Sequence, residues 1–101
     1  MIIYVDIDQT IAITPRLGNS WDYKNSCPRF KYISKINSLF EKGNEIVYWT
    51  ARGSSSGEDW SELTRSQLKS WGCKYTRIES LKKPSFDLFI DDKSITIEEL
   101  K

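Results

Sequence analysis

Histidine is absent from this chain of 101 residues, and its absence excludes more mechanisms than any other feature of the composition. Ser-His-Asp and Cys-His catalysis are ruled out, and so is zinc or haem bound through histidine. The only two cysteines, Cys27 and Cys73, lie far apart and cannot form a zinc site by themselves. They indicate free thiols in a reducing, cytoplasmic setting. Any catalysis must therefore rest on carboxylates, lysine, arginine, hydroxyl groups and a hard cation held by oxygen atoms.

Strong charge of either sign and long apolar runs are absent as well. Fifteen Lys and Arg residues against 14 Asp and Glu residues leave a formal charge of +1. This balance gives no electrostatic reason to expect nucleic acid or an anionic membrane as a partner. No run approaches the 18 or so apolar residues that span a membrane, and the N-terminus turns acidic after five residues, unlike a signal peptide. We therefore expect a single cytoplasmic domain over residues 1–101.

Short apolar segments alternate with helical patterns along the chain. This alternation predicts an α/β fold with a Rossmann-like, mainly parallel sheet flanked by helices. Asp59 and Glu62 have the spacing of a capping box at the start of the second helix. The expected elements are a strand at 2–6, a loop at 7–27, a helix that starts near Pro28 and ends at Gly43, a strand at 45–50, a helix from Asp59 to Gly72, and strands at 74–79 and 86–90.

Polar residues follow three of the expected strands at the point where each strand ends. Asp6 ends the first strand, Thr50 ends the second long apolar strand, and Asp91 and Asp92 follow the last. In an open parallel sheet these groups would converge at one edge, where such folds place their sites. Asp8 adds another carboxylate two residues after Asp6. Crowded carboxylates need a neutralising cation, and an all-oxygen ligand set suits Mg²⁺.

The segment DIDQT at residues 6–10 matches an Asp-x-Asp-x-Thr signature. Thr50 at a strand end, Lys83 before Pro84, and the run FDLFIDD follow in the order that completes it. On these motifs the chain resembles the haloacid dehalogenase-like phosphohydrolase superfamily over most of its length. The resemblance implies that superfamily's core fold, here without a cap domain, and magnesium-dependent phosphomonoester hydrolysis.

The resemblance also implies a role for each catalytic residue. Asp6 would attack phosphorus to form an aspartyl-phosphate. Asp8 would protonate the leaving oxygen and then activate water. Thr50 would hydrogen-bond the phosphate oxygens, and Lys83 would balance the charge on phosphate and Asp6. Lys82 and Lys93 compete with Lys83 for this last role.

A magnesium site is implied at the same position. Its ligands would be Asp6, Asp8 through its main-chain carbonyl, and one or both acids of the Asp91–Asp92 pair. Asp92 is expected to bind the metal directly, and Asp91 to be a second ligand or the partner of Lys83. The two acids could also exchange these roles.

Substrate binding is assigned to Thr10, Ala51 and Arg52, which flank the catalytic residues in sequence. Arg52 either forks onto a substrate phosphate or carboxylate, or is a surface arginine. Trp21 and Tyr23 either stack on a sugar or base, or pack as a minor core beneath their loop. Gln9 departs from the superfamily pattern, which commonly has glycine there, so it bears on the geometry beside the nucleophile and on activity.

The substrate implied is a small phosphorylated molecule. Stretches such as YWTARGS and KPSFDLFIDDK resemble small capless members linked to surface-polysaccharide biosynthesis, which suggests a phosphorylated sugar. One alternative is a phosphatase acting on polynucleotide ends, which the near-neutral charge disfavours. Another is a catalytically weak binding module of the same fold. A receiver domain is excluded by motif order, because its phosphorylated aspartate ends a middle strand. Without a cap, the site is either open or completed in a homo-oligomer.

Overall fold

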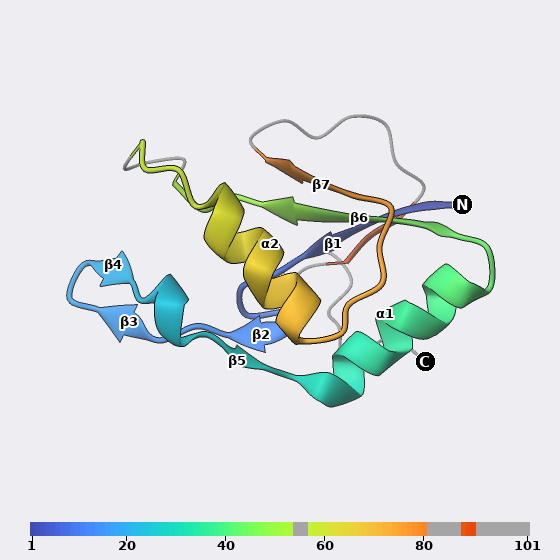
Figure 1. Ribbon diagram of the computed structural model, residues 1–101, viewed down its shortest axis with the longest axis horizontal. Coiled ribbons are helices and arrows are strands. Elements are labelled where there is room, and N and C mark those ends of the chain that lie inside the picture. The colour runs from blue at the N-terminus through green and yellow to red at the C-terminus, as the bar shows by residue number, and fades with distance from the viewer. Residues whose placement is uncertain (54–56, 81–87, 91–101) are drawn as a thin grey trace.

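The computed structural model describes residues 1–53, 57–80 and 88–90. Within them, a parallel sheet carries two helices and a group of short hairpins (Figure 1). This confirms an α/β fold with a parallel sheet flanked by helices. The strands are β1 (Ile2–Asp6), β2 (Ala12–Ile13), β3 (Arg16–Leu17), β4 (Ser20–Trp21), β5 (Cys27–Pro28), β6 (Glu45–Thr50), β7 (Arg77–Ser80) and β8 (Leu88–Ile90), and the helices are η1 (Tyr23–Asn25), α1 (Phe30–Glu41) and α2 (Ser61–Ser70).

The main sheet has the strand order β7-β6-β1-β8, and all of its pairings are parallel. The chain runs outward from β1 to β6 and β7, and then β8 pairs on the other side of β1. The strand order therefore reverses at β1, and its carboxyl end is a topological switch point. Open α/β sheets bind ligands in the crevice outside such a point. Asp6 is the last residue of this strand.

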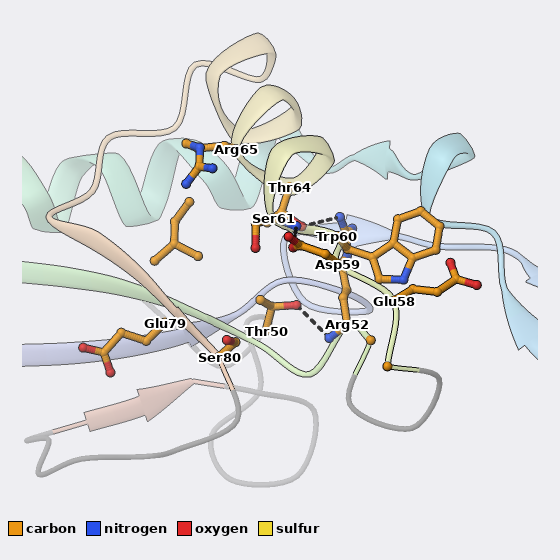
Figure 2. Close-up of a pocket in the computed structure, with 13 residues that line it drawn as sticks. Thr50, Arg52, Glu58, Asp59, Trp60, Ser61, Thr64, Arg65, Glu79 and Ser80 are labelled. Carbon is orange, nitrogen blue, oxygen red and sulfur yellow. Dashed lines mark hydrogen bonds between the residues drawn. The ribbon is translucent and has the colours of Figure 1, made fainter.

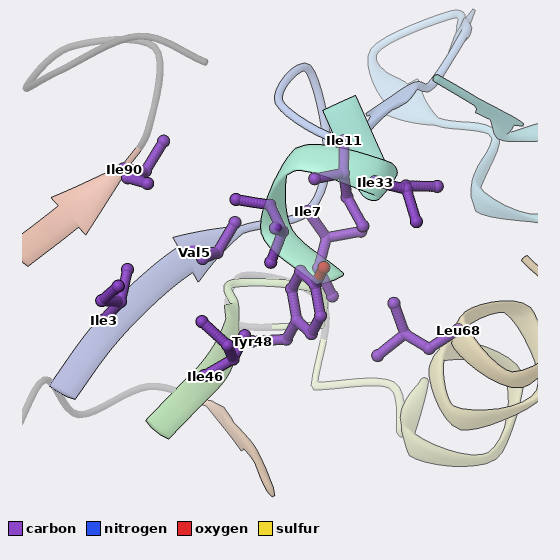
Figure 3. Close-up of a cluster of buried hydrophobic side chains, with 10 residues drawn as sticks. Ile3, Val5, Ile7, Ile11, Ile33, Ile46, Tyr48, Leu68 and Ile90 are labelled. Atoms are coloured by element: carbon purple, nitrogen blue, oxygen red, sulfur yellow. The ribbon is translucent and has the colours of Figure 1, made fainter. Parts of the chain in front are cut away.

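Both helices cover the same face of the sheet, as two successive right-handed crossovers require. Alternate residues of β1 and β6, among them Val5 and Tyr48, pack against Ile33 of α1 and Leu68 of α2 (Figure 3). These side chains are at most 2% exposed. The opposite face carries a second buried pair, Tyr4 and Val47. Since both faces of the two central strands are buried, their runs are apolar throughout rather than alternating.

The segment expected to be a loop at 7–27 contains two small antiparallel hairpins, β2–β5 and β3–β4. They lie toward the carboxyl end of the sheet (Figure 1). The expectation that Pro28 lies in the first turn of a helix is wrong: Pro28 pairs with Ala12 in β5, and α1 begins at Phe30. Pairing at this short two-residue ladder holds proline in an extended conformation, which its fixed φ allows.

The helix ends match the sequence signals in part. Gly43 and Gly72 follow α1 and α2 with φ of 97° and 73°, as glycine stop signals predict. The capping box, however, is wrong. Asp59 does accept a bond at the start of α2, but from the amide of Ser61, only two residues ahead, at 2.9 Å. This bond closes a local turn before the helix, and Trp60 occupies the cap position without a side-chain cap.

Two further expectations concern the thiols and membranes. Both cysteines are free, and burial raises the pKa of the Cys73 thiol to about 11. Such a thiol is a poor nucleophile at neutral pH. In the part of the chain that the structure describes, neither helix has the length and apolar character needed to cross a membrane.

Candidate active site

The turn that follows β1 sets the geometry around the candidate nucleophile. The carbonyl of Ile7 accepts the amides of Thr10, Ile11 and Ala12 at 3.0 to 3.2 Å, which folds the chain tightly just after Asp6. Gln9 donates its amide to the Ala12 carbonyl at 2.7 Å. So compact a turn brings the backbone from the end of β1 directly into β2.

Gln9 has a φ of 64°, and among the described residues it is the only non-glycine one with a positive value. The left-handed conformation costs a non-glycine residue about 1–2 kcal/mol. Its side chain offsets part of this cost, because Nε2 donates to the carbonyl of Thr14 at 2.8 Å. The position therefore has the conformation that favours glycine, and glutamine adds a tether across the turn.

Asp8 is held from two sides. Nε and Nη2 of Arg52 donate to its Oδ2 and Oδ1 at 2.9 and 2.7 Å, forming a two-bond fork. The hydroxyl of Thr14 donates to Oδ1 at 2.5 Å and also shares a hydrogen bond of 2.7 Å with the hydroxyl of Ser26. Charge-assisted, bidentate bonds of this kind are strong and fix orientation as well as position.

Arg52 in turn is fully enclosed, with a side chain only 1% exposed. Besides its two bonds to the aspartate, Nη1 donates to Thr64 at 3.2 Å and to Gln67 at 2.6 Å. Nη2 also donates to Ser26 at 3.3 Å. The guanidinium lies 4.8 Å from the centre of the Tyr23 ring. A guanidinium has five N–H donors, and these contacts engage all of them.

These contacts change the expected role of Arg52. It is not a surface arginine, and its donors are occupied by protein groups rather than directed at a substrate. For Tyr23 the structure supports packing beneath the loop. The centre of its ring lies 5.1 Å from that of Trp60, in an edge-on arrangement, and the ring also packs beside Arg52. Gln67 ties the same loop to α2, because its Nε2 donates to the Tyr23 carbonyl at 2.6 Å.

Thr50 ends β6 beside the end of β1, since its neighbour Trp49 is the register partner of Asp6. The side chain is buried, and its hydroxyl oxygen accepts the amide of Arg52 at 3.0 Å (Figure 2). This bond uses a lone pair of the oxygen and not the hydroxyl hydrogen. A threonine set in this way can donate to an anionic oxygen.

A cavity of about 420 Å³ opens beside Thr50, between the ends of β6 and β7 and the start of α2 (Figure 2). Its polar lining includes two carboxylates whose pKa values lie below their ordinary range. Hydrogen bonds from Ser61 lower that of Asp59, and the bond from Arg77 lowers that of Glu79. Neither Asp6 nor Asp8 is among its lining residues, which are Thr50, Arg52, Gly53, Gly57, Glu58, Asp59, Trp60, Ser61, Thr64, Arg65, Ile78, Glu79 and Ser80.

The remaining expected site residues divide into three groups. Thr10 is 1% exposed, and its carbonyl accepts Nη1 of Arg29 at 3.0 Å, so it supports the turn from inside. Its buried Oγ1 has no hydrogen-bond partner among the described residues. Ala51 is exposed directly after Thr50. Lys83, Asp91 and Asp92 lie outside the described residues, as do the competing Lys82 and Lys93.

The donor chemistry near Asp6 can be tested against a magnesium ion. Within 1–53, 57–80 and 88–90, no three His, Cys, Asp or Glu side chains gather into a group that could hold a metal. Asp8 commits both carboxylate oxygens to Arg52 and Thr14, whereas the backbone bonds of the turn are accepted by Ile7 and Ala12. Among the described residues, a magnesium ion here would therefore be held by the Asp6 carboxylate and the Asp8 main-chain carbonyl. Both are hard oxygen donors of the type that Mg²⁺ prefers.

Four residues of this site were not predicted from the sequence: Thr14, Ser26, Thr64 and Gln67. Thr14 and Ser26 approach from the segment between β2 and β5, and Thr64 and Gln67 from α2. They lie 6 to 26 residues from their partners Asp8 and Arg52 and form no local motif. Of these four residues, only Thr64 has a sequence signal that could have identified it. It interrupts an apolar stripe between Trp60 and Leu68 at helical spacing, and a polar residue at such a position needs a buried partner.

Comparisons with known proteins bear on the fold alone. No family model and no curated protein matches the chain. A crystal structure of a structural genomics (MCSG) target from Vibrio cholerae is similar, with a TM-score of 0.69 and 25% sequence identity. The match covers 98% of this chain and 85% of that one. The similarity supports the α/β architecture.

Proposed function

We propose that the protein is a magnesium-dependent phosphomonoesterase with a haloacid dehalogenase-like core, and that it works through an aspartyl-phosphate on Asp6. One observation carries the proposal. Asp6 ends the strand at which the sheet order reverses, and Thr50 ends the neighbouring strand. The carboxylate and the hydroxyl thus lie at the same edge, where open α/β sheets bind ligands.

In the first step, a carboxylate oxygen of Asp6 attacks phosphorus, and the bond from phosphorus to the leaving oxygen breaks. Asp8 starts protonated on Oδ2, at the lone pair that the bond from Arg52 does not use, and supplies this proton to the leaving oxygen. Thr50 donates its hydroxyl hydrogen to a phosphate oxygen. Mg²⁺, held by Asp6 and the Asp8 carbonyl together with Asp92 or Asp91, would offset the charge of the phosphate, and Lys83 would add to this.

In the second step, Asp8 takes a proton from water, the water oxygen attacks phosphorus, and the bond to Asp6 breaks. Inorganic phosphate leaves and both aspartates are restored. The same carboxyl group thus gives and then recovers one proton, which allows acid–base chemistry in a chain without histidine.

The cavity beside Thr50 is the proposed site for the leaving group. Its lining combines three carboxylates (Glu58, Asp59 and Glu79) with hydroxyls, the half-buried indole of Trp60 and the exposed guanidinium of Arg65. Because the carboxylates outnumber this guanidinium, the lining suits a neutral, hydroxylated group better than a polyanion. This favours a small phosphorylated sugar or related metabolite over nucleic acid. A cytoplasmic location and a homo-oligomer stay predictions.

The test is phosphate release from sugar phosphates, nucleotides and 3′-phosphorylated oligonucleotides, with Mg²⁺ and with chelator. We expect Asp6→Asn to abolish release. Glu41→Gln, which changes an exposed carboxylate on α1, is the matched control and should leave release unchanged. Preference for the oligonucleotides would favour the polynucleotide alternative. A folded wild type that binds Mg²⁺ but releases no phosphate would reject the enzyme in favour of a binding module.

A further inference from the structure

We infer that Arg52 is the positioning residue for Asp8, and that through it the loop at 22–26 and helix α2 fix where the proton-transferring carboxyl stands. The inference rests on the proposed function and deepens it. Arg52 itself is enclosed, with no donor left for a substrate, so its effect on the reaction passes through the aspartate that it holds.

The geometry supports positioning rather than simple charge pairing. The guanidinium is planar, and its Nε and Nη2 engage the two oxygens of Asp8 separately, at 2.9 and 2.7 Å. This fork fixes the plane of the carboxyl group as well as its distance. Lysine, with a single point charge on a flexible stem, can keep the charge but cannot reproduce the fork.

Two parts of the chain hold the guanidinium in place. α2 contributes Thr64 and Gln67, and the hairpin segment contributes Ser26 and the ring of Tyr23. Gln67 also closes a link between the two, since it accepts from Arg52 and donates to the Tyr23 carbonyl. Among these side chains Thr64 also lines the proposed leaving-group cavity, so the position of Asp8 is linked to that cavity.

A general acid matters most when the leaving group is basic, and a general base matters for breakdown of the aspartyl-phosphate. Two aryl phosphates of similar shape separate these effects. Phenyl phosphate loses phenol, which requires a proton, whereas p-nitrophenyl phosphate loses a weakly basic anion that does not. In the wild type, kcat/KM reports the step in which this group leaves.

The experiment compares wild type, Arg52→Lys, Arg52→Met and Asp8→Asn on both substrates with Mg²⁺. For Arg52→Lys, and likewise for Asp8→Asn, we expect kcat/KM to fall about tenfold or more further on phenyl phosphate than on p-nitrophenyl phosphate. We also expect a burst of nitrophenolate stoichiometric with enzyme, because water activation slows. Lys74→Met, which removes an exposed ion pair elsewhere, should show neither effect.

Equal losses on the two substrates, with no burst, would show that Arg52 only maintains the fold and would overturn the inference. Full activity of folded Arg52→Lys on phenyl phosphate would overturn it as well. If Arg52→Met does not fold, Arg52→Lys and Gln67→Leu carry the test, the latter with the same pattern at smaller size. Wild type without Asp6-dependent release from either aryl phosphate would reject the proposed function and this inference together.

Discussion

Two ion pairs with the same N···O distance lie at opposite ends of the strands, one at the carboxyl edge of the sheet and one at the amino edge. They differ in almost everything else. At the carboxyl edge, Arg52 and Asp8 are 2.7 Å apart, with side chains 1% and 23% exposed. At the amino edge, Lys74 and Glu41 are also 2.7 Å apart, but their side chains are 51% and 60% exposed. Water competes for the second pair and hardly for the first, so distance alone says little about what either pair contributes.

The surroundings of the two pairs differ in the same way. The buried guanidinium has every donor engaged by protein, whereas the ammonium of Lys74 makes one exposed bond. Polar groups enclosed in this manner make a region specific and intolerant of change, because each lost partner leaves another buried group unsatisfied. The carboxyl edge should therefore respond strongly to substitution and the amino edge weakly.

The largest effect is expected for Arg52→Met. Removing one partner of an enclosed pair leaves the Asp8 carboxylate without its main donor, and such losses cost about 3 kcal/mol or more. Urea unfolding followed by tryptophan fluorescence would measure the drop in the free energy of unfolding. The double variant Asp8→Leu with Arg52→Met should recover part of it, since no charge is then stranded. A drop below about 1 kcal/mol for Arg52→Met would contradict the comparison.

The backbone at the carboxyl edge is expected to be the next most sensitive feature. Gly53 has a φ of 83°, and a Cβ there would lie 2.0 Å from the main-chain oxygen of Glu58. Gly53→Ala should lower the free energy of unfolding by at least about 2 kcal/mol, from conformational strain and from this clash. Gly72, at the amino edge, has a φ of 73° and nothing within 4 Å of its Cβ position.

Gly72→Ala is therefore the matched control, because it carries the strain without the clash. It should cost about 1 kcal/mol. Urea unfolding of the two variants side by side gives the difference. Equal losses would mean that the loop after β6 shifts easily, and that the carboxyl edge is less constrained than its contacts indicate.

The sequence predicted the parts of this fold that depend on local patterns. The strands Ile2–Asp6 and Glu45–Thr50 have the expected bounds, because a short continuous apolar run is typical of a strand buried on both faces. The small hairpins between 12 and 28 were missed. Their strands are two residues long, too short to show any periodicity.

The candidate site was predictable only in its first residues. Asp6, Asp8 and Thr50 could be placed at one edge because parallel strands end together. The hydrogen bonds from Arg52 to Asp8 could not be predicted, because 44 residues separate the two and contacts at such a distance leave no local sequence signal. In addition, the sequence alone does not distinguish a buried arginine from a solvated one.

A pair of intermediate exposure on β7 sharpens the comparison through pH. Nε of Arg77 bonds Glu79 at 2.7 Å, and this bond lowers the pKa of Glu79 below its ordinary value of 4.5. A carboxyl with a lowered folded pKa stabilises the protein above its unfolded value and loses that contribution as the pH falls. The free energy of unfolding should therefore decrease below about pH 4.5.

Arg77→Met should lower the free energy of unfolding slightly near neutral pH, where Glu79 is ionised, and the difference from wild type should shrink in acid, where both proteins lose this contribution. Urea unfolding of wild type and variant across the acid range would measure it. An identical acid decrease in both proteins would show that Arg77 does not act on Glu79 in solution.

The smallest effect is expected for Lys74→Met. The Lys74–Glu41 pair is solvated on both sides, and exposed pairs contribute about 0.2–1 kcal/mol, which salt screens further. Its loss should change the free energy of unfolding by less than about 0.5 kcal/mol at low salt and by nothing measurable in about 1 M NaCl. The loss in Arg52→Met should persist in that salt, because counterions do not reach an enclosed guanidinium. If the two variants responded alike to salt, burial would not explain the difference between the two pairs. Arg52 would then hold Asp8 no more firmly than an exposed lysine holds its partner.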